Sequence, residues 1–188
     1  MANTEINSGI VSGDRYLSAA ALDANAAKAA SALHSAGVWQ GDVVALLLRN
    51  DFAFFEATRG AALLGATTVP MNWHMSNEEI AYVLDDCDAK ILIAHSDLLT
   101  ESVLALCGGR EVVAVHTPPE IATAFGIGPS LCVAPRAVPE WYQWLSAFDP
   151  WRDEPRALSN PMFYTSGTTG MPKGVLRKPV APEVAARA

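Results

Sequence analysis

Four short apolar runs, separated by helix-like stretches, constrain the fold of this chain most. They cover residues 43–48, 67–71, 90–94 and 111–115. The first run, Val43–Leu48, shows no polar alternation, which is typical of a strand buried on both faces of a sheet. Because the stretches between runs can each hold a helix, the sequence predicts βαβ units. We therefore expect an α/β fold with a mostly parallel sheet and helices on both faces.

The stretches between the runs carry helix start and stop signals. Residues 18–36 are rich in alanine with apolar residues on one face, and Gly37 follows where a C′ glycine belongs. Asn50 and Asp51 are candidate caps for the next helix, and Ser76–Glu79 reads as a capping box. Further helices are expected over residues 52–63, 97–106 and 140–148.

The charge balance excludes one class of partner. The chain has 13 Lys and Arg against 20 Asp and Glu, a formal net charge of −7. Non-specific nucleic-acid binding depends on neutralising phosphates, so no nucleic-acid partner is expected. An anionic ligand would need a local site. The hydrophobic share of 51% against 18% charged residues also excludes an intrinsically disordered chain.

Cysteine usage and hydropathy bear on the cellular compartment. Cys87, Cys107 and Cys132 form neither a disulfide framework nor a C-x-x-C motif, so reduced thiols in a cytoplasmic protein are expected. The first residues lack the basic and apolar regions of a signal peptide. Val43–Leu48 is far shorter than the roughly 20 residues of a transmembrane helix, so no such segment is expected.

The clearest chemical signal is a loop rich in glycine and hydroxyl residues after the apolar segment 162–165. Its glycines let backbone N–H groups approach an anion, and its hydroxyls add donors. Lys173 adds a mobile positive charge. The loop is not a Walker A motif, because Gly174 stands where that motif has Ser or Thr. The composition predicts a polyphosphate-binding loop.

At these residues the chain resembles a known family. The segment Tyr164–Val175 is similar to the phosphate-loop signature of the adenylate-forming acyl-CoA synthetases, also called AMP-binding ligases. Residues 41–46, 64–72, 79–84 and 89–93 also resemble N-terminal stretches of that family. Asn72–His74 is similar, less specifically, to bacterial fatty-acyl and aryl-acyl members.

The resemblance implies an enzyme that activates a carboxylic acid with Mg-ATP to an acyl-adenylate and transfers it to coenzyme A. ATP, Mg²⁺ and coenzyme A would be its cofactors, and fatty acid metabolism its setting. Thr165 would approach the magnesium as well as a phosphate. Carried onto this sequence, the phosphate contacts would be Thr165, Ser166, Gly167, Thr168, Thr169, Gly170 and Lys173.

Family members are much longer and carry a magnesium-binding Glu, a ribose-binding Asp and a C-terminal domain with a catalytic Lys after this loop. We therefore expect a truncated enzyme without catalytic residues of its own. Residues 1–160 would form an N-terminal α/β subdomain with a Pro/Gly-rich connector at 117–139, and 161–188 the strand, the loop and the start of the next subdomain. The chain alone would be inactive and would self-associate through exposed apolar surface.

Two alternatives stay open. One is a non-catalytic remnant that binds a nucleotide weakly or serves as an interaction module. The other is an adenylation domain that serves a carrier protein instead of coenzyme A.

Histidine and aspartate side chains outside the loop give weaker signals. His74 follows a β-prone segment, at the edge where α/β proteins place ligands, and is a candidate site-lining residue. The other histidines lack metal-ligand spacing. Asp85, Asp86 and Asp88 resemble a paired-carboxylate site but are expected to form a solvated turn.

Two further pairs are expected to be structural. Trp141 and Trp144 are three residues apart, which favours packing under the connector over a ligand platform. Glu56 and Arg59 have the spacing of an ion pair on a helix surface.

Overall fold

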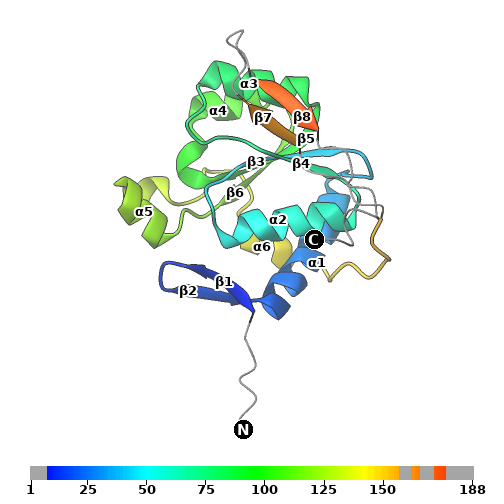
Figure 1. Ribbon diagram of the computed structural model, residues 1–188. Coiled ribbons are helices and arrows are strands. Elements are labelled where there is room, and N and C mark those ends of the chain that lie inside the picture. The colour runs from blue at the N-terminus through cyan, green and yellow to red at the C-terminus, as the bar shows by residue number, and fades with distance from the viewer. Residues whose placement is uncertain (1–7, 157–161, 166–171, 177–188) are drawn as a thin grey trace, which may run out of the picture.

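A four-stranded parallel sheet forms the centre of the molecule. The computed structural model describes residues 8–156, 162–165 and 172–176. The strand order is β4-β3-β5-β6. The strands are the four apolar runs, so the predicted α/β fold is confirmed (Figure 1). Their bounds are Val43–Leu47 for β3, Thr67–Pro70 for β4, Ala89–His95 for β5 and Glu111–Val115 for β6.

Helices cover both faces of this sheet (Figure 1). α1 (Ala19–Ser35), α2 (Phe52–Leu63) and α6 (Trp141–Ser146) lie on one face. α3 (Asn77–Asp86) and α4 (Glu101–Leu106) lie on the other. Alternate residues of the two central strands, β3 and β5, enter the two cores, which explains the apolar runs Val43–Leu47 and Ile91–Ala94. The first core takes Val44, Leu46, Ile91 and Ile93, and the second takes Ala45, Leu47, Leu92 and Ala94.

Most predicted helix boundaries are confirmed. Gly37 adopts a φ of 84° after α1. Ser76 and Glu79 form a capping box, in which the Ser76 hydroxyl accepts from the Glu79 amide at 3.3 Å and the Glu79 carboxylate accepts from the Ser76 amide at 2.8 Å. α4 is shorter than expected, because a 3₁₀ turn, η1 (Ser96–Leu98), precedes it and Thr100 caps it.

Several short elements were not predicted. β1 (Gly9–Ser12) and β2 (Arg15–Ser18) form an antiparallel hairpin at the N-terminus. The 117–139 connector contains a helix, α5 (Pro119–Phe125), and a 3₁₀ turn, η2 (Pro129–Leu131). Proline at the first helical positions of α5 starts the helix instead of breaking it. The predicted division at residue 160 stays a prediction.

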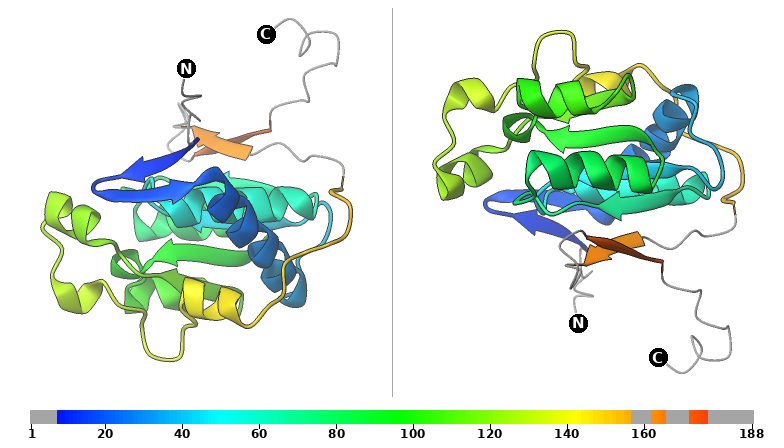
Figure 2. Two further views of the ribbon diagram at one scale, coloured as in Figure 1. Left: turned by 90° about the horizontal axis from the view of Figure 1, so that it is seen from below. Right: turned by 90° about the horizontal axis from the view of Figure 1, so that it is seen from above.

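A second hairpin lies beside the sheet. β7 (Met162–Thr165) pairs antiparallel with β8 (Lys173–Leu176), which was not predicted as a strand. Figure 2 shows this hairpin at one edge of the sheet, where β7 contacts β4. A hydrogen bond between Tyr164 and Asp86 joins β7 to α3. At the opposite edge of the sheet, the Ala114 amide of β6 donates to the Pro139 carbonyl at 2.9 Å, and Ala114 bridges to Glu140.

Candidate functional site

The carboxyl ends of β3 and β5 meet where the order of the sheet reverses. The chain passes from β3 to β4 on one side and then returns to place β5 on the other side of β3. Such a switch point is where α/β sheets place ligands. Arg49 follows β3 there, and His95, Ser96 and Asp97 end or follow β5. The sequence placed only His74 at the edge where such sheets bind ligands. The structure adds Arg49, His95, Ser96 and Asp97 to this edge.

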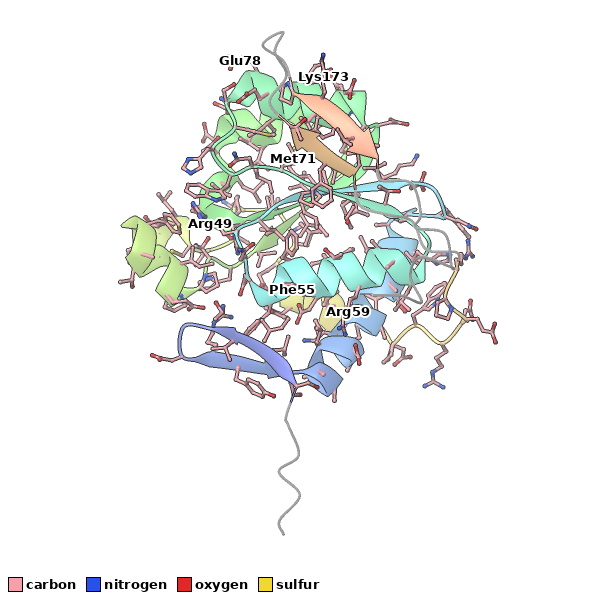
Figure 3. The ribbon with its side chains drawn as sticks, viewed as in Figure 1. Arg49, Phe55, Arg59, Met71, Glu78 and Lys173 are labelled. Atoms are coloured by element: carbon pink, nitrogen blue, oxygen red, sulfur yellow. The ribbon has the colours of Figure 1, made fainter. Side chains whose placement is uncertain are left out.

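Arg49 is the buried cation of this edge (Figure 3). Its two terminal nitrogens lie 2.9 Å from the two Asp97 carboxylate oxygens, and the side chains are 8% and 6% exposed. The guanidinium carbon lies 4.8 Å from the ring centroids of both Trp73 and Phe125. The Thr117 hydroxyl donates to Asp97 at 2.6 Å. Both terminal nitrogens of Arg49 are thus paired, whereas its Nε is buried without a hydrogen-bond partner. The adjoining cavity of about 260 Å³ is lined by Leu48, Arg49, Asn50, Trp73, Ile121 and Phe125.

Asp51 holds a second polar cluster at the same edge. It occupies the N-cap position of α2, but its side chain makes no capping hydrogen bond, so that part of the prediction was wrong. Its carboxylate instead accepts from Arg15 at 2.5 Å and lies 3.6 Å from His95 Nε2. Burial opposes ionisation, but the neighbouring His95 and Arg15 outweigh it and hold the pKa of Asp51 below its ordinary value. Arg15 also binds Glu120, which ties the N-terminal hairpin to α5.

The predicted phosphate loop connects β7 to β8 in the sequence. Thr165 and Lys173 are register partners across its two strands, and both are exposed. Opposite residues of an antiparallel pair point to the same face, so a hydroxyl and an ammonium group flank the loop on one side. The other predicted contacts lie outside the described residues: Ser166, Gly167, Thr168, Thr169 and Gly170.

His74 and Thr165 line one cavity, although 90 residues separate them in the chain. The cavity measures about 220 Å³, and its lining includes Tyr164 and Glu79. The His74 ring lies against the Trp73 ring, with ring centroids 3.4 Å apart and the ring planes tilted by 34°. Trp73 also lines the Arg49 cavity, so the linings of the two cavities meet at this pair of rings.

Asp86 is a contact of the loop-bearing hairpin that sequence reasoning missed. Tyr164 donates its hydroxyl hydrogen to Asp86 at 2.6 Å. Its neighbour Asp85 pairs with Arg110 at 2.7 Å instead. Both carboxylates are exposed as expected, but they belong to the last turn of α3 and not to a separate turn, and each has a specific partner. No sequence signal links Asp86 to a residue 78 positions away.

Glu56 is not the surface residue that the helix spacing predicted. It is fully buried and accepts hydrogen bonds from Trp141 at 2.8 Å and Asn25 at 2.7 Å, while Arg59 pairs with Asp23. Burial raises the pKa of Glu56. The predicted Glu56–Arg59 pair is therefore wrong. Trp141 has the expected packing role, but it packs in the core with α1, α2 and the sheet and not under the 117–139 connector.

Other kinds of site have less support. Burial raises the pKa of the Cys87 thiol to about 11, which keeps it protonated and unreactive. Within residues 8–156, 162–165 and 172–176, no group of three or more His, Cys, Asp or Glu side chains is arranged to hold a metal ion. Across the same residues, none of the helices has the length and apolar character that crossing a membrane requires.

Comparison with known proteins agrees with this architecture. The family model described as AMP-binding enzyme matches residues 3–178. The medium/long-chain-fatty-acid–CoA ligase FadD6 of Mycobacterium tuberculosis is 34% identical over 167 residues, which cover 86% of this chain and 25% of that protein. The long-chain-fatty-acid–CoA ligase FadD13 of the same species is 31% identical over 170 residues, which cover 87% of this chain and 30% of FadD13.

A solved structure shows the same fold. The anthranilate CoA ligase AuaEII, in complex with anthranoyl-AMP, superposes with a TM-score of 0.72 at 26% identity, over 87% of this chain and 30% of that one. The chain thus spans only about a quarter to a third of the length of these relatives. Since the family model covers nearly all of the sequence, the chain belongs to the AMP-binding enzyme family.

Proposed function

We propose that this chain is the N-terminal part of an acyl-CoA synthetase, which activates a carboxylic acid with Mg-ATP and transfers the acyl group to coenzyme A. The observation that carries the proposal is the family match over residues 3–178, which includes the loop signature Tyr164–Val175. The CoA ligases FadD6 and FadD13 favour coenzyme A as the acceptor, while the fatty acid–[acyl-carrier-protein] ligase ScoC of Streptomyces coeruleorubidus, 29% identical over 151 residues, keeps a carrier protein as the alternative.

The described flanks of the loop fit the phosphates of ATP. Thr165 offers a hydroxyl and Lys173 an ammonium group from opposite strands of one hairpin. Ser166, Gly167, Thr168, Thr169 and Gly170 would add backbone and hydroxyl donors between them. The Thr165 oxygen is a hard ligand of the kind Mg²⁺ prefers. Donors and metal together would stabilise the charge that develops on the departing pyrophosphate.

His74 would be a further residue that lines the ATP site. It lines the cavity next to Thr165, so its imidazole would lie beside a phosphate held by the loop. The remaining machinery would come from sequence beyond this chain, since the relatives are three to four times as long. We accordingly expect the 188-residue chain by itself to form neither acyl-adenylate nor thioester.

ATP–pyrophosphate exchange tests the proposal, with the protein expressed from its complete reading frame and supplied with fatty and aryl acids. Lys173→Ala should raise the KM for ATP by roughly 10- to 100-fold, which corresponds to losing a hydrogen bond to a charged group. Lys90→Ala is the matched control, because Lys90 is an exposed strand lysine at the amino end of β5.

Two outcomes would contradict the proposal. One is the absence of acid-dependent exchange with every acid tested, which would favour the non-catalytic remnant. The other is a KM for ATP that Lys173→Ala changes no more than Lys90→Ala does, which would remove the loop from ATP binding.

A further inference from the structure

One hydrogen bond ties the hairpin that carries the phosphate loop to α3. The Tyr164 hydroxyl donates to Asp86 Oδ2 at 2.6 Å. Tyr164 immediately precedes Thr165, and Lys173 lies opposite Thr165 on β8. Thr165, the first residue of the predicted loop contacts, therefore directly follows a residue that is hydrogen-bonded to α3.

Asp86 is itself held in place on α3. Tyr82, one helical turn earlier, donates its hydroxyl hydrogen to Asp86 Oδ1 at 3.3 Å. The second oxygen, Oδ2, then faces Tyr164. A carboxylate in the last turn of a helix opposes the helix dipole, and the last turn of α3 contains no basic residue. The stability of α3 alone does not explain Asp86 at this position.

Gly174 makes the arrangement sterically feasible. It is the register partner of Tyr164, and a Cβ at this position would lie 3.1 Å from Tyr164 Cζ and 3.2 Å from its hydroxyl oxygen. A larger residue would push the phenol ring aside. An isolated two-stranded hairpin is only marginally stable, so β7–β8 depends on such contacts for its position.

We propose that Asp86 is a positioning residue for the phosphate loop: acting through Tyr164, it fixes Thr165 and Lys173 relative to the carboxyl edge of the sheet. The inference rests on the proposed function, since it assigns a role in ATP binding. Burial and the Asp86 carboxylate both raise the pKa of Tyr164, so the phenol remains a hydrogen-bond donor at neutral pH.

Steady-state kinetics of the complete protein test this role with Asp86→Ala, Tyr164→Phe and the double variant. Each single change should raise the KM for ATP about three- to tenfold, as expected for an exposed, charge-assisted hydrogen bond. The double variant should be no worse than either single one, because both remove the same bond. The KM for the acid should not change. Asp86→Asn keeps an acceptor oxygen and should restore most of the affinity.

Asp85→Ala is the matched control, because Asp85 is the adjacent exposed carboxylate and pairs with Arg110, away from the hairpin. It should leave the KM for ATP unchanged. Thermal unfolding, measured in parallel, separates positioning from stability. If Asp86→Ala fails to fold, Tyr164→Phe, which removes one oxygen, gives the same test.

Two results would overturn the inference. One is a lowered melting temperature with an unchanged KM for ATP in both Asp86→Ala and Tyr164→Phe, which would make the bond purely structural. The other is additive effects of the two substitutions. A wild-type protein without ATP-dependent activity would instead refute the proposed function, so the two failures are distinguishable.

Discussion

Replacing Asp97 by alanine tests the buried ion pair at the switch point. Asp97→Ala leaves the Arg49 guanidinium, whose side chain is 8% exposed, without its counter-charge. Breaking one partner of a buried pair costs about 3–5 kcal/mol of unfolding free energy. For a chain of this size, a loss of 1 kcal/mol lowers the melting temperature by about 2–4 °C. We therefore expect the melting temperature to fall by about 6–20 °C.

A double-mutant cycle in urea isolates the pairwise contribution. Arg49→Met keeps an apolar side chain between Trp73 and Phe125, where a thioether contacts aromatic rings favourably. On that background, Asp97→Ala should cost no more than about 1 kcal/mol, because it removes a carboxylate that Arg49→Met has left buried without its counter-charge, and only the hydrogen bond from Thr117 is lost with it. The coupling energy should then be at least about 2 kcal/mol, within the range measured for residues in contact. Tryptophan fluorescence reports the transition.

The Arg59–Asp23 pair supplies the control. Its side chains are 51% and 67% exposed, so Asp23→Ala should cost less than about 1 kcal/mol. If Asp97→Ala costs no more than Asp23→Ala, or if the cycle is additive, burial does not set the strength of the Arg49–Asp97 pair and the reasoning is wrong.

Two further predictions concern the core. Because burial raises the pKa of Glu56, the folded chain holds this proton to higher pH than the unfolded chain does, so stability falls as pH rises above the unfolded value of about 4.3. Glu56→Gln should not lose stability in this way as pH rises. In urea unfolding between pH 4 and 7, the midpoint of the variant should therefore rise relative to that of the wild type; a difference in midpoint that does not change with pH would contradict the prediction. Gly60→Ala would place a Cβ 2.7 Å from Ala29 Cβ between α1 and α2, and should lower stability by about 1–3 kcal/mol in urea unfolding. Gly128→Ala, with open space around it, should be neutral, and equal effects would refute the packing argument.

The sheet and its main helices were predictable because each has a local cause. Val43–Leu47 is apolar on both faces, and Ser76 and Glu79 lie close enough in sequence for a capping box to be recognised. The β1–β2 hairpin has no such signal. Its position depends on Arg15 reaching Asp51 and Glu120, which lie 36 and 105 residues away.

Within the candidate site, only the residues that belong to the loop signature were predictable from the sequence. Thr165 and Lys173 follow from the loop pattern, and their pairing across β7–β8 adds geometry that composition cannot supply. Asp86 and Glu56 were misjudged, because the partners of each come from distant segments. The expected self-association stays a prediction.

The protection of the two outer strands bears on how this chain could aggregate. Ala114 in β6 is already bonded to the Pro139–Glu140 segment, and β4 is a four-residue strand ending in Pro70, which has no amide hydrogen. Short, proline-bearing or occupied edges oppose the addition of a foreign strand. Fibril growth by extension of this sheet is therefore disfavoured. Association through side-chain surfaces, such as the exposed Phe163 and Val175 on β7–β8, is not opposed in this way.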